Sequence, residues 1–334
     1  MHLLHNISLK PYNTFQIDVP AEWFAEVSSQ ADLEEISGFP HQKHILGGGS
    51  NVLLTQPVSG LVVHNKLKGI TVEKEDKDNV WVRVQSGEIW HDFVLYAVNN
   101  GWGGVENLAL IPGTVGAAPI QNIGAYGVEA KETIESVSFW YWKEKTMLTY
   151  SSRDCAFGYR DSIFKHQLKD KVFITSVVFK LSKNPEYNTS YGAVKEELEH
   201  MGVYELSVKA IAYAVMSIRN SKLPDPKKIG NAGSFFKNPT IARRQYEHLR
   251  AKYDSIPTYP VSNDLVKIPA AWLIERCGWK GYKKGDSGVH TKQALVLVNY
   301  GNAKGKDIWK LSDDIVTTVK AEFNIILERE VQVW

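Results

Sequence analysis

Two glycine-rich segments have the composition of loops that bind an anion through their backbone. The first, Gly47–Asn51, has three consecutive glycines followed by Ser50 and Asn51, and apolar residues flank it on both sides. Because glycine has no Cβ, several backbone N–H groups of such a segment can converge on one phosphate. The residues that follow favour a strand, so no helix begins there, and the dinucleotide fingerprint of Rossmann folds is excluded. A tight β-turn is the alternative for this segment on its own.

The second segment, Asn107–Gly127, is long, uncharged and rich in small residues. Such a segment can lie flat against a large, partly apolar ligand and donate backbone hydrogen bonds to it, which is how many ligand sites combine apolar walls with a few polar groups. A buried structural loop is the alternative. Two separated glycine-rich loops in one β-rich lobe favour a dinucleotide such as FAD over that alternative.

Two polar clusters could act on a substrate. In Phe157–Ser162, Arg160 stands next to Asp161 and close to two aromatic residues. An arginine held by a neighbouring aspartate is a pre-oriented fork for a substrate carboxylate or an enolate, whereas a surface ion pair is the alternative. In Gly230–Pro239, Ser234 is framed by small residues and could donate a proton or anchor a hydrogen bond. A simple turn serine is the alternative there.

The composition excludes several classes of protein. Of 334 residues, 43% are hydrophobic and 23% are charged, which is ordinary for a globular enzyme and excludes disorder. Lys and Arg number 39 against 37 Asp and Glu, so the net charge of +2 gives no electrostatic case for a nucleic-acid or membrane partner. The two cysteines form no zinc motif, and the N-terminus lacks the pattern of a signal peptide. We therefore expect a soluble cytoplasmic protein without a bound metal.

The elements that must position these residues differ between the two halves of the chain. Strands are expected in the first half at His44–Leu46, Val52–Leu54, Leu61–Val63, Val80–Val84 and Val172–Phe179. Helices are expected there at Ala31–Ile36 and Trp90–Asn99.

The second half is richer in helices. Ser190–Met201 is expected to be helical, and Ser207 can cap a helix that must end before Pro224. Further elements are expected as helix Ala270–Cys277, strand Ala294–Val298, the long amphipathic helix Lys306–Phe323 and a short final strand. The pattern predicts an α+β protein with two lobes that meet near Lys222–Pro226.

The motifs, taken in order, resemble a known family. Leu46–Asn51, Ile111–Gly116 and Gln121–Gly127 resemble the two-part FAD-binding domain of the vanillyl-alcohol-oxidase (PCMH) type. With four further segments the chain resembles the UDP-N-acetylenolpyruvoylglucosamine reductase (MurB) family from Asn13 to Val333; these are Tyr159–Ser162, Lys222–Pro226, Gly230–Pro239 and Leu327–Val331. The inserted segment 188–192 resembles the tyrosine loop of one of the family's two types.

The resemblance implies roles for individual residues. Arg160 and Glu330 correspond to the pair that flanks the enolpyruvyl carboxylate, and Ser234 corresponds to the proton donor. Six residues fall at substrate-binding positions: Tyr191, Arg219, Lys222, Asn238, Tyr259 and Gln293. The cofactor-binding residues are Gly47, Gly48, Gly49, Ser50, Asn51, Pro112, Gly113, Gly116, Gln121, Asn122, Gly124, Ala125 and Tyr126. The sequence departs from the family at Arg329, where a proline often stands.

The resemblance also implies a reaction. NADPH would reduce FAD, and the reduced flavin would pass a hydride to the enolpyruvyl group of a UDP-sugar nucleotide, which completes UDP-N-acetylmuramate for peptidoglycan, cell shape and division. Arg160 would stabilise the negative charge that develops beside the carboxylate, and Ser234 would deliver the proton. Glu330 would act as a polarising group or, when protonated, as a hydrogen-bond donor. We expect a monomer.

Four regions follow from the resemblance. They are an FAD-binding domain over 1–185 with subdomains 1–67 and 68–185, a tyrosine loop with connecting helices over 186–221, a substrate-binding C-terminal α+β domain over 222–323, and a terminal strand over 324–334 that carries Glu330. Two alternatives remain. One is a flavin oxidase of the same fold that passes electrons to oxygen, and the other is a sugar-nucleotide-binding module without flavin.

Overall fold

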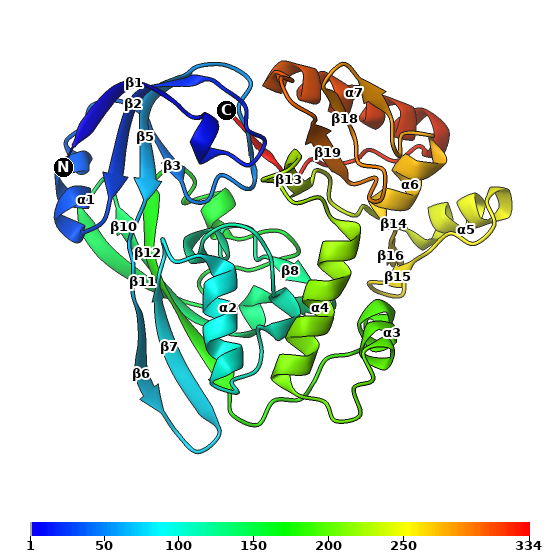
Figure 1. The fold of residues 1–334 in the computed structure, drawn as a ribbon, viewed down its shortest axis with the longest axis horizontal. Helices are drawn as coiled ribbons and strands as arrows, with labels where there is room; N and C mark the ends of the chain where they lie inside the picture. The colour runs from blue at the N-terminus through cyan, green and yellow to red at the C-terminus, as the bar shows by residue number, and fades with distance from the viewer. Residues whose placement is uncertain (1) are drawn as a thin grey trace. The chain divides into compact units, whose positions relative to one another are not determined.

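The computed structural model describes residues 2–334, and the chain divides into two units. The first unit contains the residues up to Ile7 together with Ala21–Gly48 and Ser59–Ser221. The second contains Ser8–Pro20, Gly49–Val58 and Lys222–Trp334. The second unit therefore combines the last third of the chain with two short segments from the first sixty residues, which Figure 1 shows in blue. The four regions expected from the sequence stay a prediction.

One sheet of the first unit carries the first glycine-rich segment at the end of a strand. Its order is β1 (Leu3–Ser8), β2 (Pro20–Val27), β5 (Val58–Asn65) and β3 (Lys43–Leu46). Helix α1 (Gln30–Ser37) begins at a capping box in which Ser29 and Asp32 bind each other's backbone N–H groups. The parallel pair β3 and β5 ends where the three glycines begin, so the sheet fixes the start of that loop.

The second sheet of this unit has five antiparallel strands. Its order is β11 (Thr146–Ser151), β10 (Ile134–Tyr141), β12 (Val172–Ser182), β7 (Asn79–Gln85) and β6 (Ile70–Glu75). In β7 the side chains of Val80, Val82 and Val84 are fully buried, which confirms the alternation expected from the sequence. Helices α2 (Trp90–Asn99) and α4 (Val208–Lys222) pack apolar side chains into the same core, and α3 (Gly192–His200) contributes two more.

The second unit is built around an antiparallel sheet whose first strand leads to Ser234. The strand order is β13 (Gly230–Ser234), β19 (Val296–Asn299), β18 (Ser287–Val289) and β17 (Lys283–Lys284). Helix α7 (Gly305–Phe323) packs on this sheet and contacts α6 (Ala270–Arg276). A smaller sheet has the order β14 (Thr240–Ala242), β16 (Leu265–Lys267) and β15 (Tyr259–Pro260), with α5 (Arg243–Lys252) beside it.

The remaining elements are short. Strand β20 (Gln332–Val333) pairs in parallel with β4 (Val52–Leu53), and β8 (Gly124–Ala125) pairs with β9 (Val128–Glu129). The 3₁₀ helices are η1 (Lys10–Tyr12), η2 (Glu106–Leu108), η3 (Val115–Ala117), η4 (Ala130–Glu132) and η5 (Ile163–Lys165). The long uncharged segment expected to form loops thus folds into most of η2, η3, the two-residue strand β8 and the turns between them.

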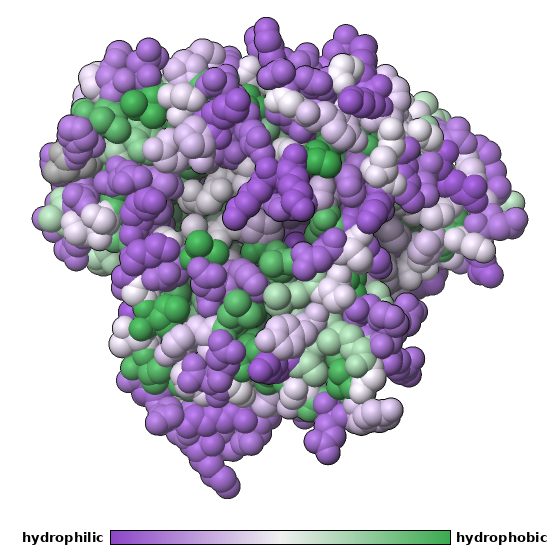
Figure 2. Space-filling view, in the orientation of Figure 1, coloured by the Kyte–Doolittle hydropathy of each residue, from purple (hydrophilic) through white to green (hydrophobic). Residues whose placement is uncertain are grey.

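The predicted α+β class is confirmed, and most predicted elements are present. α2 has the predicted bounds, and α7 differs from the prediction by one residue at its start. The predicted strand Ala294–Val298 begins only at Val296, and α5 was not predicted at all. Across residues 2–334, no helix combines the length and the apolar character that crossing a membrane requires. On the face shown in Figure 2, apolar residues form small groups among hydrophilic ones.

Candidate functional site

The start of the first glycine-rich segment and part of the second lie against each other in the first unit. A Cβ atom built on Gly48 would lie 3.0 Å from Gly113 Cα, and one built on Gly47 would lie 2.5 Å from Thr114 Oγ1. Contacts as short as these leave no room for a side chain at either position. The predicted anion loops are therefore adjacent, although Gly48 and Gly113 are 65 positions apart in the sequence.

Several backbone N–H groups at this junction remain available for a ligand. Thr114 forms an antiparallel bridge with Ile89, and the two hydrogen bonds of this bridge use the neighbours, Trp90 N–H to Gly113 O (3.0 Å) and Val115 N–H to Glu88 O (2.8 Å). Residues between such bonded neighbours direct their own N–H groups away from the partner strand. Among the hydrogen bonds of residues 2–334, none uses the N–H of Gly48, Gly113 or Thr114. This donor set fits a phosphate group of a dinucleotide.

The later part of the second segment is held by one buried amide. Asn122 is fully buried, and its Nδ2 donates to Gly158 O at 2.9 Å and to Glu129 Oε2 at 3.0 Å. Its Oδ1 accepts from Lys131 N–H at 2.9 Å. The side chain of Asn122 therefore ties the segment to the turn before Arg160. Five other predicted cofactor residues lie within the same segment of this unit: Pro112, Gly116, Gln121, Gly124 and Ala125.

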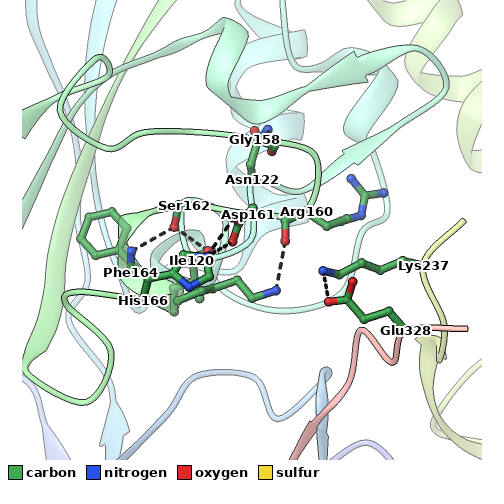
Figure 3. A network of polar contacts seen from close by, with 11 residues as sticks. Ile120, Asn122, Gly158, Arg160, Asp161, Ser162, Phe164, His166, Lys237 and Glu328 are labelled. Carbon is green, nitrogen blue, oxygen red and sulfur yellow. Dashed lines mark hydrogen bonds and ion pairs between the residues drawn. The ribbon is translucent and has the colours of Figure 1, made fainter. Parts of the chain in front are cut away.

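Arg160 stands in a left-handed turn, with φ of 52°. Its guanidinium donates to the carbonyl oxygen of Gly124, and its own carbonyl accepts from Lys165 Nζ at 3.0 Å. The geometry differs from the predicted fork with Asp161, because that carboxylate is bound by His166 at 2.8 and 3.0 Å and the Arg160 side chain points away from it (Figure 3). Burial alone would raise the pKa of Asp161, but the hydrogen bonds from His166 and the Ser162 N–H, with the charges of His166 and Lys165, together outweigh it and lower that pKa.

A tyrosine–arginine cluster brings together three predicted residues. The rings of Tyr126 and Tyr191 meet edge to face, with centroids 5.3 Å apart and planes at 90°. Tyr126 is also hydrogen-bonded to Arg219; burial raises the pKa of Tyr126, although the charge of Arg219 opposes this. Arg219 Nε is buried and has no hydrogen-bond partner among residues 2–334. A buried donor of this kind calls for an acceptor, which a ligand can provide.

In the second unit, Ser234 ends strand β13 and is exposed, whereas Phe235 and Phe236 after it are buried. The turn before Ser234 depends on Gly233, whose φ is 68°, and on Asn231 Oδ1, which accepts from Gly233 N–H at 3.0 Å. The buried phenylalanines anchor the chain and leave the serine hydroxyl on the surface of this unit.

The segment of Glu330 pairs with the segment of Ser234. Glu330 N–H donates to Phe235 O, and Lys237 N–H donates to Glu328 O, both at 2.9 Å. On the other side of Glu330, Asn51 Nδ2 donates to the Glu330 carbonyl oxygen at 3.3 Å. The structure therefore brings Glu330 and Ser234 onto neighbouring stretches of one unit.

The first glycine-rich segment is divided between the two units. Gly47 and Gly48 belong to the first, and Gly49, Ser50 and Asn51 belong to the second. A Cβ atom on Gly49, whose φ is 60°, would lie 2.0 Å from the carbonyl oxygen of Tyr12, so this glycine is required by packing within the second unit. Arg160 belongs to the first unit, whereas Ser234 and Glu330 belong to the second.

Of the four other predicted substrate residues in the second unit, two make local hydrogen bonds and two are exposed. Asn238 Oδ1 accepts from Ala270 N–H at 2.9 Å at the start of α6, and Gln293 Oε1 accepts from Leu295 N–H at 3.3 Å. Lys222 and Tyr259 are exposed. Asn231 and Lys165 were not predicted, because each acts by binding a backbone group, of Gly233 and of Arg160 respectively, and not by contact with a ligand.

Two family models match the chain. The model described as FAD binding domain matches residues 21–148. The model described as UDP-N-acetylenolpyruvoylglucosamine reductase, C-terminal domain, matches residues 225–334. The first model includes Leu46–Asn51, Ile111–Gly116 and Gln121–Gly127, and the second includes Gly230–Pro239 and Leu327–Val331, whereas Tyr159–Ser162 lies between the two matched ranges.

Similar proteins extend these matches to the whole chain. The UDP-N-acetylenolpyruvoylglucosamine reductase of Flavobacterium johnsoniae is 49% identical and covers 100% of both chains. That of Amoebophilus asiaticus is 47% identical and covers 100% of this chain and 99% of its own. A crystal structure of UDP-N-acetylenolpyruvylglucosamine reductase (MurB) from Thermus caldophilus is similar with a TM-score of 0.70 at 24% identity, covering 100% of this chain and 98% of that one. This last likeness supports the fold.

Proposed function

Because the chain belongs to the UDP-N-acetylenolpyruvoylglucosamine reductase family, we propose that it reduces UDP-N-acetylglucosamine enolpyruvate to UDP-N-acetylmuramate with NADPH, in the synthesis of peptidoglycan precursors. Bound FAD supplies the hydride chemistry, for which side chains have no equivalent. The glycine-rich junction in the first unit fits this cofactor, because Gly47 and Gly48 leave no room for side chains and the nearby N–H groups can bind a phosphate.

Arg160 stabilises the charge that forms on the substrate. When hydride adds to the methylene carbon, negative charge develops on the neighbouring carbon and spreads into the carboxylate. A guanidinium held in place before the reaction stabilises this charge without reorganising at the moment of transfer. The bonds to Gly124 O and from Lys165 Nζ support this role, because they fix both the side chain and the backbone of Arg160.

Ser234 donates the proton and Glu330 completes the site. The observation that carries this assignment is the backbone pairing that holds Glu330 beside the end of β13. An exposed hydroxyl at the end of a strand can move its proton to a substrate carbon. Glu330, which is half-buried, either polarises that hydroxyl or, when protonated, donates a hydrogen bond to the substrate.

The remaining predicted residues bind the sugar nucleotide. Within residues 2–334, the buried Nε of Arg219 has no hydrogen-bond partner, which supports contact with an anionic or carbonyl group of the substrate. Tyr191, packed on Tyr126, and the exposed Lys222 are assigned to the pyrophosphate. Asn238, Tyr259 and Gln293 complete the proposed substrate set.

Ser234 separates the two half-reactions, which gives the test. Ser234→Ala should keep near-normal bleaching of the flavin absorbance by NADPH in a stopped-flow experiment, because that step needs no proton from this hydroxyl. Reoxidation by the enolpyruvyl sugar nucleotide should slow by about 10²–10⁴, the usual effect of losing a positioned acid. Ser234→Cys should recover part of the loss, because a thiol also donates a proton.

Ser262→Ala is the matched control, since Ser262 is an exposed serine of the same unit whose hydroxyl accepts only from Asp264 N–H among the hydrogen bonds of residues 2–334. It should change neither half-reaction. If Ser234→Ala slows bleaching and reoxidation equally, Ser234 only shapes the turn. The proposal also includes a monomeric, cytoplasmic enzyme without a nucleic-acid partner, which light scattering and cell fractionation test.

A further inference from the structure

Arg329 connects the terminal segment to helix α7 through three kinds of contact. Its Nε donates to Ser312 Oγ at 2.8 Å, and its guanidinium forms an ion pair with the carboxylate of Asp313. The guanidinium carbon also lies 4.0 Å from the ring centroid of Trp309. Since positions 309, 312 and 313 share one face of a helix, a single arginine can reach all three.

The anchoring helix face is itself fixed. Ser312 is fully buried, and its hydroxyl donates to Trp309 O at 2.6 Å, so its lone pairs remain to accept from Arg329. A planar guanidinium can stack on an aromatic ring while its edges make hydrogen bonds, which a lysine ammonium cannot do. The contacts therefore restrict both the position and the plane of the Arg329 side chain.

The same residue lies at the centre of the pairing that carries Glu330. Phe236 and Arg329 form an antiparallel bridge, and the hydrogen bonds on either side use Glu328 and Glu330. Successive side chains of an extended segment point to opposite faces. When the Arg329 side chain binds α7, the side chains of Glu328 and Glu330 must therefore point to the other face. The ion pair between Glu328 and Lys237 on that face agrees with this alternation (Figure 3).

We propose that Arg329 is a positioning residue that, by binding Trp309, Ser312 and Asp313 of α7, fixes the rotation of the terminal segment and thereby the direction of the Glu330 side chain. The backbone bonds set the register of this segment, and beyond Glu330 the chain is held by Asn51 and by the pairing of β20 with β4. Before Glu330, the pairing consists of one bridge, which is too short on its own to prevent twisting. The role of Glu330 in turnover rests on the proposed function, whereas the anchoring of the segment does not.

The kinetic test uses the holoenzyme. Misplacing a reacting group by about 1 Å costs about 10²-fold in rate, so Arg329→Ala should slow flavin reoxidation by the enolpyruvyl sugar nucleotide by about 10- to 100-fold. Bleaching by NADPH and the KM for the sugar nucleotide should stay within about twofold, because neither depends on the direction of Glu330. Arg329→Lys should recover part of the rate by pairing with Asp313. Asp314→Asn, which removes the next charge along α7, is the control and should leave the rate unchanged.

A double-mutant cycle shows whether Arg329 acts through Glu330. In the Glu330→Gln background, Arg329→Ala should slow reoxidation by no more than about twofold further, because residues that act together are not additive. Losses that multiply would overturn the proposal, as would a wild-type rate in Arg329→Ala with only a lower Tm.

Hydrogen exchange tests the anchoring without any substrate. The N–H groups of Glu330 and Lys237 should lose protection in Arg329→Ala and keep it in Asp314→Asn, because only the first change releases the segment. Unchanged protection in Arg329→Ala overturns the anchoring even if the enzyme proves to act on another substrate. Lost protection supports it in either case, which separates this inference from the proposed function.

Discussion

Replacing Gly47 by alanine should weaken FAD binding through one identifiable contact. The new Cβ atom would lie 2.5 Å from Thr114 Oγ1, well inside the 3.4 Å at which ordinary contact begins. Either the two glycine-rich segments would separate or the Thr114 side chain would be displaced, and overpacking of this kind costs about 1–3 kcal/mol. If this cost falls on the conformation that binds the cofactor, the Kd for FAD rises by about 5- to 150-fold.

The same contact provides its own rescue. The other Thr114 atoms near the new methyl group, Cβ and Cγ2, would lie at 3.6 and 3.7 Å, which is ordinary contact. Thr114→Ala removes Oγ1 and with it the clash. The double variant Gly47→Ala/Thr114→Ala should therefore bind FAD nearly as tightly as the single variant Thr114→Ala. Gly38→Ala is the control, because its Cβ would lie 3.6 Å from the nearest atom, Glu35 O.

The assay is a titration of apoprotein with FAD, followed by flavin fluorescence, together with the Tm of each apoprotein. An unchanged Kd for Gly47→Ala would refute the reasoning. So would a double variant that binds FAD as weakly as the single one, because the clash with Oγ1 would then not be the cause.

Two further predictions concern charge. Lys222→Ala should raise the KM for the sugar nucleotide by about 10- to 150-fold, as expected for hydrogen bonds to a charged group worth about 1.5–3 kcal/mol. The control Lys227→Ala should leave this KM unchanged. An unchanged KM in Lys222→Ala together with impaired NADPH kinetics would contradict the assignment. Burial raises the pKa of Glu106, although the hydrogen bonds that its carboxylate accepts act in the opposite direction. The stability that Glu106 contributes is therefore fully present below its pKa in the unfolded state, and it is lost as the pH rises through its pKa in the folded state. Glu106→Gln should therefore gain stability relative to wild type as pH rises, measured as urea midpoints over a pH series; a difference independent of pH, or the same trend in exposed Glu144→Gln, would refute it.

Several elements of this fold are predictable because their buried apolar side chains repeat at a regular spacing. In α7 the side chains of Ile308, Leu311, Ile315 and Val319 repeat at helical spacing and are all buried. Helix α5 has no buried residue, so its sequence carries no apolar period. Strand β10 is buried at most positions without alternating, which hides its period of two.

The site was predictable as motifs but not as contacts. The need for glycine at 47 and 48 follows from the anion-loop pattern, yet the partners that enforce it, Thr114 and Gly113, come from a distant segment. The expected pairing of Arg160 with Asp161 was wrong because adjacent side chains in a turn point apart, and His166 takes the carboxylate. Such contacts depend on tertiary packing, which local sequence does not encode.

The most direct test of the central claim is an anaerobic single turnover of the purified holoenzyme, followed by flavin absorbance. We expect NADPH to bleach the flavin and UDP-N-acetylglucosamine enolpyruvate to restore its absorbance, with one UDP-N-acetylmuramate formed for each flavin. Absence of a flavin, or recovery of absorbance only when oxygen is admitted, would contradict the account.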